Sequence, residues 1–458
     1  MKSSFQTGMG GLMLLCLMLL LVIACSSPPS SAPDNPRNVV FLLGDGMGYA
    51  QVKAYRMYAD DLSTNLVEPL PVDALQAGSV STDSIIMNCD PTGRVCSRDP
   101  HGFTDSASSA TAYATGQDTV VGRLSMTPSG QTMTTVLESA TMQGKSTGLV
   151  ATSELTHASP AAFGSHVASR DQANDIADQY LDNRWDAMPM IDVLMGGGLS
   201  HMRRADRDLV SEFHEAGYKV ALNRSELLSM EGDHLLGLFS PLGMPRAWDR
   251  DDETPSLAEM TQLALKSLDQ NPNGFFLFVE GSQVDWASHD NSIIGVISEM
   301  EDFMEATRLV LEYAQKNRDT LVIITADHET GGMSLGRDNI YRWNSQALNG
   351  VHSTPVAMTA RFLTGDAPLS EIISEQVQFE LSSAETQLLD ATPREQLAAI
   401  NAITDLFNKR TLTGWSTTGH TGVDVPLYVF GPGSEHFHGV MQNEDIGRVL
   451  REVFLGGE

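Results

Sequence analysis

Short apolar runs and one long amphipathic stretch dominate the pattern of hydrophobic and polar positions along the chain. Each of five runs of apolar or β-branched residues is followed by polar residues or glycine, which predicts strands at 38–43, 147–151, 274–279, 320–325 and 425–430. Residues 293–316 carry apolar side chains at helical spacing between two of these runs, which indicates a βαβ crossover. We therefore expect an α/β fold, a three-layer αβα sandwich with a large, mostly parallel central sheet and helical insertions.

Polar clusters follow the predicted strands, and ligands of parallel sheets bind beyond the carboxyl ends of strands. The first cluster is 44–48, where Asp45 is flanked by glycines. A glycine-rich turn from strand to helix with an aspartate cap explains this segment equally well. On its own, Asp45 is an ambiguous candidate.

Carboxylates and imidazoles recur near the later strands. Asp285 and His289 are four residues apart, so on a helix they share one face and can bind a single ion. The other candidates, at strand ends or just before the last strand, are Glu280, Asp327, His328 and His420. Either pair alone, Asp285 with His289 or Asp327 with His328, could equally well be two solvent-facing side chains or two metal ligands. Three strand ends of one sheet carry candidate residues of this kind, which favours a single shared site.

Residues 104–112 have the pattern of a cap followed by an alanine-rich helix. Ser106 would lie at the N-terminus of this helix, where free backbone amides favour anions and an attacking alkoxide. A serine that only caps the helix is the commoner meaning of such a pattern. The spacing does not separate a nucleophile from a cap.

Together these segments resemble the alkaline phosphatase family. The matching motifs, in family order, lie at 44–48, 105–107, 153–162, 169–170, 192–198, 279–281, 285–289, 325–332 and 419–421. The resemblance extends over residues 38–335 and 414–433. It implies an alkaline phosphatase-like fold, hydrolysis of phosphate monoesters through a phosphoserine, and a homodimer.

The resemblance also implies a role for each candidate residue. Ser106 would be the nucleophile, and Arg170 would hold the phosphate oxygens in its planar guanidinium group, which lysine replaces poorly. Two zinc ions would be bound, one by Asp285, His289 and His420, the other by Asp45, Asp327 and His328. One magnesium ion would be bound by Glu280, Ser159 and the bridging Asp45. Two zinc ions would stabilise the attacking and leaving oxygens, with an alkaline pH optimum.

Three positions depart from the family pattern. Ser159 replaces the usual threonine but keeps the hydroxyl, so we expect magnesium binding to survive. His157 stands where some members have aspartate, and Trp286 where some have lysine or histidine. Compared with those members, the site lacks a carboxylate at position 157 and a cationic side chain at position 286. We therefore expect the magnesium ion and the product phosphate to be bound less tightly.

Other functions fit parts of the pattern. One alternative is another hydrolase of the same fold: a phosphodiesterase, a phosphonate hydrolase or a sulfatase. Ser106, Arg170 and the candidate magnesium ligands favour phosphate monoesters as substrates instead. A lipoprotein that binds phosphate or metal without catalysis is another. It predicts a damaged nucleophile or ligand set, whereas every expected position is filled.

Residues 345–413 have the character of an insertion in the domain at 38–458. Within it, 369–409 is strongly helical in pattern. Insertions of this kind decorate the crown or the dimer interface of the family, and a lone surface elaboration explains the pattern equally well.

The N-terminus indicates export. Residues 1–24 combine one lysine with an apolar run too short to span a bilayer comfortably, which favours a signal peptide. The run ends at Cys25 in a sequence that resembles a bacterial lipobox, so lipidation of Cys25 is one interpretation and an ordinary signal residue the other. Residues 25–37 would be a flexible linker. We expect a lipoprotein that faces the periplasm or the cell surface and contacts the membrane only through its lipid.

Two further features concern the exported chain. In an oxidising compartment, Cys89 and Cys96 are expected to form a small-loop disulfide. The 29 Lys and Arg against 58 Asp and Glu give a net charge of −29, which excludes a generic nucleic-acid binder. Such a negative charge would repel an anionic substrate, but bound metal cations would reduce the repulsion at the site. A protein surface adapted to salt would explain the acidic residues that do not bind metal.

Overall fold

The central strand of the fold is β1 (Asn38–Gly44), whose seven residues are all buried. It pairs in parallel with β11 (Phe275–Gly281) and with β12 (Thr320–Thr325), which are buried throughout as well. Continuous apolar strands are typical of a parallel sheet covered on both faces. The computed structural model describes Met1 and residues 35–60, 63, 68–89, 96–99 and 102–456.

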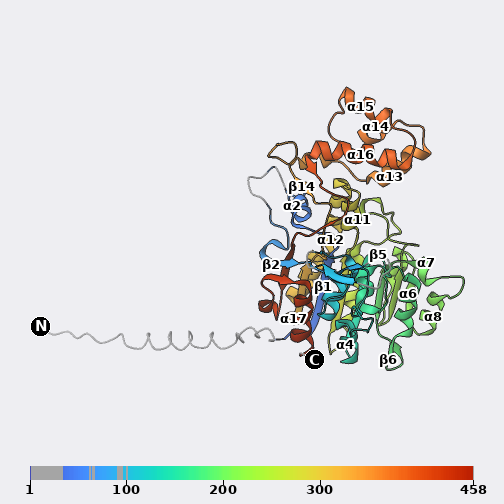
Figure 1. The fold of residues 1–458 in the computed structure, drawn as a ribbon, viewed down its shortest axis with the longest axis vertical. Helices are drawn as coiled ribbons and strands as arrows, with labels where there is room; N and C mark the ends of the chain where they lie inside the picture. The colour runs from blue at the N-terminus through green and yellow to red at the C-terminus, as the bar shows by residue number, and fades with distance from the viewer. Residues whose placement is uncertain (2–34, 61–62, 64–67, 90–95, 100–101, 457–458) are drawn as a thin grey trace. The chain divides into compact units, whose positions relative to one another are not determined.

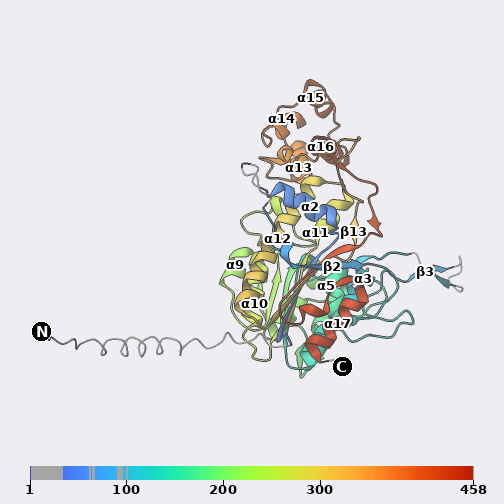
Figure 2. The ribbon, with the colours of Figure 1, turned by 90° about the vertical axis from the view of Figure 1, so that its left-hand side faces the viewer.

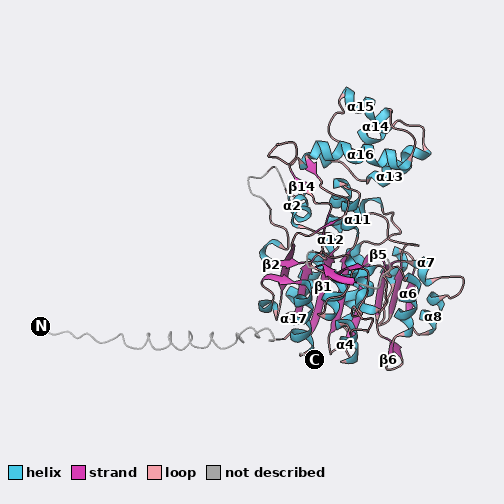
Figure 3. Ribbon diagram, in the orientation of Figure 1, coloured by secondary structure: helices cyan, strands magenta, loops and turns pink. Residues whose placement is uncertain are grey.

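Ten strands form the main sheet (Figures 1 and 3). Their order across the sheet is β18 (Gly439–Gln442), β2 (Gln76–Ser81), β17 (Val425–Phe430), β12, β1, β11, β5 (Ser146–Glu154), β8 (Val193–Gly197), β10 (Leu235–Leu238) and β9 (Lys219–Ala221). Within this sheet, β17 is antiparallel to both of its neighbours, and the other neighbouring pairs are parallel. The five strands expected from the sequence are confirmed as β1, β5, β11, β12 and β17.

Helices cover both faces of the sheet, which confirms the three-layer αβα architecture (Figure 2). On one face lie α3 (Ser106–Thr115), α4 (Val136–Met142), α5 (Ala158–Gly164) and α17 (Asn443–Leu455). The other face is covered by α10 (Leu257–Leu268) and by α12 (Ile293–Lys316), which has the bounds expected from the sequence. Packed against α12 are α2 (Tyr49–Tyr58) and α11 (Gln283–His289).

Shorter elements complete the fold. The remaining helices of the sheet region are α6 (Ala173–Asp182), α7 (Leu199–Met202), α8 (Leu209–Glu215) and α9 (Arg224–Ser229). Four two-stranded sheets pair β3 (Ile86–Cys89) with β4 (Cys96–Asp99), β6 (Arg184–Trp185) with β7 (Met188–Pro189), β13 (Glu329–Thr330) with β16 (His420–Thr421), and β14 (Ser334–Leu335) with β15 (Thr413–Gly414).

The segment expected to be an insertion forms a group of helices beyond α2 and α11 (Figure 1). These are α13 (Pro355–Thr364), α14 (Leu369–Ser374), α15 (Ser383–Asp390) and α16 (Gln396–Thr411), which pack on one another. In addition, α16 contacts α12. The helical pattern at 369–409 is thus present as three helices, while a role in a crown or a dimer interface stays a prediction.

Several expectations concern the N-terminal region and the cysteines. The proposed signal peptide and Cys25 lie outside the described residues, as does most of the 25–37 linker. The backbones of Cys89 and Cys96 are paired in the register of β3 and β4, and their disulfide stays a prediction. No helix within the described residues has both the length and the apolar character needed to cross a membrane.

Candidate active site

The predicted site residues converge at the carboxyl ends of the central strands. Asp45 follows β1, Glu280 lies at the end of β11, and Asp327 follows β12. The register aligns these ends, because Leu43 is paired with both Glu280 and Thr325. The sheet therefore gathers carboxylates from three strands at one edge.

The glycine after Asp45 is required by the same geometry. Gly46 has φ +70°, and a Cβ there would lie 2.7 Å from the Cα of Asp285. Its backbone N–H donates to Asp327 Oδ1 at 3.0 Å. The turn thus lets the first strand end close against the elements that carry the other carboxylates.

The side chains form three clusters in which ligand atoms lie within 4.8 Å of one another. Their members are Asp285, His289 and His420 in the first cluster, Asp45, Asp327 and His328 in the second, and Asp45, His157 and Glu280 in the third. The first two are the sets that the resemblance assigned to zinc. The third differs from the expectation, since it includes His157, which the sequence placed outside the ligands.

The three imidazoles of the first two clusters are oriented in the same way. His289 Nδ1 lies 2.5 Å from the carbonyl oxygen of Thr418, and His420 Nδ1 lies 3.1 Å from that of Thr104. A carbonyl oxygen only accepts, so each Nδ1 carries a proton. In His328, Nδ1 contacts the Thr330 hydroxyl, which itself donates to Asp285. Each neutral ring therefore presents the lone pair of Nε2.

The Nε2 atoms point at carboxylates. Asp285 lies 3.3 Å from His289 Nε2 and 3.8 Å from His420 Nε2. Asp327 and Asp45 lie 3.1 Å and 3.7 Å from His328 Nε2. Imidazoles held through one nitrogen, with the other nitrogen facing carboxylates, are the arrangement that metal-binding histidines adopt.

Four oxygens of the buried carboxylates lack a hydrogen-bond partner among the described residues. Both oxygens of Asp45, Oδ2 of Asp327 and Oε1 of Glu280 are unpaired. Burial and the charges of the neighbouring carboxylates raise the pKa of Asp45 well above its usual value. Burial also raises the pKa of Glu280 to about 7. Anionic groups held together in this way require positive charge, which bound cations would supply.

Ser106 lies beside the second cluster. It is the first residue of α3, is 2% exposed, and its Oγ lies 3.3 Å from His328 Nε2. Asp105 is the N-cap of α3 and accepts from the amide of Ser108 at 3.0 Å. The interpretation of Ser106 as only a helix cap is therefore wrong, because Asp105 has that role.

Asp105 has a second role that the sequence did not reveal. Its Oδ2 accepts from Arg170 Nη1 at 3.1 Å, and Arg170 Nη2 lies 3.1 Å from His157 Nε2. Burial alone would raise the pKa of Asp105, but the Arg170 charge and the amides of Ser108 and Gly122 outweigh it and lower this pKa. The same carboxylate thus orients the helix of Ser106 and the guanidinium group.

The remaining predicted residues surround the third cluster. Ser159 in α5 is buried, and its Oγ has no partner among the described residues. The ring of Trp286 meets that of His157 edge-on, with centroids 5.8 Å apart, and Arg246 lies 5.9 Å above the Trp286 ring. Trp286 therefore packs against His157.

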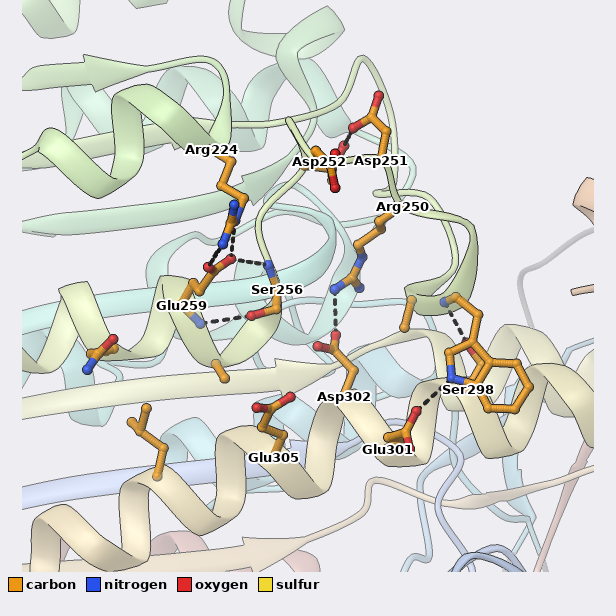
Figure 4. A pocket seen from close by; sticks show the side chains of 16 residues that line it. Arg224, Arg250, Asp251, Asp252, Ser256, Glu259, Ser298, Glu301, Asp302 and Glu305 are labelled. Carbon is orange, nitrogen blue, oxygen red and sulfur yellow. Dashed lines mark hydrogen bonds and ion pairs between the residues drawn. The ribbon is translucent and has the colours of Figure 1, made fainter. Parts of the chain in front are cut away.

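A cavity of about 560 Å³ between α10 and α12 is separate from this site (Figure 4). Its two arginines pair with carboxylates of the same cavity, Arg224 with Glu259 and Arg250 with Asp302. The residues described as lining it include none of the predicted site residues. The cavity is thus a feature of helix packing.

Comparison with known proteins gives a consistent result. A sequence model of the family described as "Alkaline phosphatase" matches residues 36–455. The chain is 44% identical over 420 residues to alkaline phosphatase 3 of Bacillus subtilis, covering 91% of this chain and 88% of that protein. It is 39% identical over 425 residues to alkaline phosphatase 4 of the same organism, covering 92% and 89%. The structure of a cold-active alkaline phosphatase from Shewanella sp. matches with a TM-score of 0.80 and 33% identity, covering 91% and 99%.

Proposed function

Because the chain belongs to the alkaline phosphatase family, we propose that it hydrolyses phosphate monoesters to an alcohol and inorganic phosphate, with Ser106 as the nucleophile. The observation that carries this proposal is the placement of the Ser106 hydroxyl. It lies at a helix N-terminus, 3.3 Å from His328 and beside two clusters of oriented imidazoles and unpaired carboxylates. A phosphate group at this position would meet backbone amides, Arg170 and bound cations.

The donor sets fit two zinc ions. Nitrogen and carboxylate oxygen are zinc ligands, and the Nε2 lone pairs and unpaired carboxylate oxygens are available for them. The first would be held by Asp285, His289 and His420, and the second by Asp45, Asp327 and His328. Divalent cations bound there supply positive charge that stabilises the attacking and leaving oxygens.

The protein's own groups then perform two displacements. Ser106 Oγ attacks phosphorus, the bond to the alcohol oxygen breaks, and a phosphoserine forms. Water attacks the phosphoserine, which frees inorganic phosphate and restores the Ser106 hydroxyl. In both steps Arg170, held by Asp105, binds phosphate oxygens and fixes the orientation of the group.

The third cluster supports one magnesium ion less well. Glu280, Asp45 and the unpaired Ser159 hydroxyl offer the oxygen ligands that magnesium prefers. His157 adds a nitrogen, which suits transition metals better than magnesium. We propose a magnesium site here that His157 weakens.

The reaction class is tested with two substrates. We expect the purified protein to hydrolyse p-nitrophenyl phosphate faster than bis-p-nitrophenyl phosphate at alkaline pH. The Ser106→Ala variant should lose at least about a thousandfold in kcat. Preference for the bis-ester would identify a phosphodiesterase instead, and full activity of Ser106→Ala would overturn the proposed nucleophile.

Export, lipidation at Cys25 and a homodimer complete the proposal. The short apolar run that ends at Cys25 supports lipidation, and the family resemblance supports the dimer. Radiolabelled palmitate should be incorporated into the parent chain but not into Cys25→Ser. Light scattering of the protein without residues 1–25 should give the mass of two chains.

A further inference from the structure

A second cavity, of about 760 Å³, opens beside the first cluster. One wall is α16, and the opposite wall comes from the end of α11 and from residues 413–418. His289 and Thr418 line it, and these two residues are joined by the 2.5 Å contact that orients His289. The cavity therefore borders the first cluster at His289, whereas Asp285 and His420 are not among its lining residues. Its size is that of pockets for small organic ligands.

The wall formed by α16 is one face of the helix. Its lining residues follow helical spacing and are Leu397, Ile400, Asn401, Thr404, Asp405 and Asn408. Thr404 and Asn408 are 8% and 5% exposed, and Thr404 Oγ1 and Asn408 Oδ1 have no partner among the described residues. An unpaired buried oxygen costs free energy that a ligand donor would recover.

The charged groups of the cavity leave one carboxylate without a cation. Arg337 pairs with Asp338 at 3.1 Å, and Asp290 pairs with Arg246 at 3.2 Å. Asp405 is exposed, and no ion pair to it is found in the part of the chain that the structure describes. The ring of Trp415 lines the same space, and the faces of indole rings attract cations. The cavity thus offers hydrogen-bond acceptors and negative charge.

The position of the cavity suits the alcohol part of a substrate. In an in-line displacement, the leaving oxygen departs on the side opposite the attacking atom. Ser106 contacts the second cluster, so the leaving oxygen is expected at the first cluster, whose His289 lines the cavity. We propose, on the basis of the function proposed above, that this cavity binds the leaving alcohol and favours alcohols with a cationic amino group.

Three substrates of similar size test the preference. Phosphocholine has a cationic alcohol, glycerol phosphate a neutral one and phosphoglycerate an anionic one. The parent enzyme should rank them in this order by kcat/KM. In Asp405→Asn, the ratio of kcat/KM for phosphocholine to that for glycerol phosphate should fall about fivefold, the size expected for one exposed charge pair.

The matched control is Asp390→Asn, which removes an exposed carboxylate at the end of α15, away from the cavity, and should leave the ratio unchanged. Titration calorimetry with phosphocholine in a Ser106→Ala background gives a readout independent of turnover, and adding Asp405→Asn should weaken binding about fivefold. An unchanged ratio in Asp405→Asn, or an equal fall in the control, overturns the inference. Absence of p-nitrophenyl phosphate hydrolysis by the parent would instead contradict the proposed function itself.

Discussion

Replacing His157 by aspartate should tighten magnesium binding at the third cluster. Arg170 Nη2 lies 3.1 Å from His157 Nε2, and a guanidinium group only donates, so Nε2 accepts and the ring proton is on Nδ1. His157 Nδ1 is buried without a partner among the described residues. In this state both nitrogens are occupied, and a cation would have to displace Arg170 or the proton. A carboxylate has enough lone pairs to accept a hydrogen bond from Arg170 and to bind a cation at the same time.

The magnitude follows from charge and distance. The ligand atoms of the third cluster lie within 4.8 Å of one another. At an effective dielectric constant of 20, a unit charge about 4 Å from a divalent cation gains roughly 8 kcal/mol. Desolvation of the new carboxylate, beside Asp45 and Glu280, removes most of this gain. A net gain of about 2 kcal/mol corresponds to a dissociation constant for magnesium about thirtyfold lower.

Thermal unfolding shows how the His157→Asp substitution changes stability without magnesium and with magnesium bound. In EDTA, His157→Asp should unfold at a lower temperature than the parent, because a further carboxylate joins Asp45 and Glu280 without a cation. In millimolar magnesium the order should reverse. The control His214→Asp makes the same chemical change at an exposed position of α8 and should show no reversal. Equal magnesium-dependent shifts in parent and His157→Asp would refute the reasoning.

Further predictions concern metals, phosphate and pH. Chelation should lower the Tm of the parent in calorimetry, since the buried Asp45 and Asp327 lose their counter-charge; an unchanged Tm would exclude a stabilising cation. Trp286→Lys should lower the inhibition constant for phosphate, and equal or tighter inhibition of the parent would contradict this. Burial alone would lower the pKa of His166, but the hydrogen bond that His166 Nε2 donates to Glu138 Oε1 at 2.8 Å outweighs it and raises this pKa. This pair therefore stabilises the fold fully below about pH 6.5 and less as pH rises through the raised value. The Tm difference between parent and His166→Gln should be largest near pH 6 and should shrink by pH 9; a constant difference would show that the pair does not titrate.

The central strands were predictable because strands that are buried on both faces consist almost entirely of apolar residues. All seven residues of β1 are buried, so a continuous apolar run is sufficient to identify the strand. The outer strands carry no such signal. β9 has three residues, and β2 has the sequence QAGSVS, so both depend on pairing with neighbours for their conformation.

The site was predictable to the extent that each candidate metal-binding residue follows a strand or shares a helix face with another. Asp285 and His289 fall four residues apart, and Asp327 follows β12 directly. The contacts of His157 and Asp105 depend on tertiary packing, because each lies at the N-cap of a helix and meets Arg170 from a distant segment. Asp105, directly before the candidate nucleophile, was the signal that could have revealed the partner of Arg170.

The central position of β1 also affects how the newly synthesised chain folds. The strands on its two sides end at Gly281 and Thr325, and His420 arrives only with β16. Contacts between segments so distant in sequence form slowly. During synthesis, both edges of an apolar strand therefore stay unpaired until most of the chain has emerged, a period in which the chain is open to aggregation. A fragment that stops before His420 would contain Ser106, the proposed nucleophile, but only two of the three residues of the first cluster.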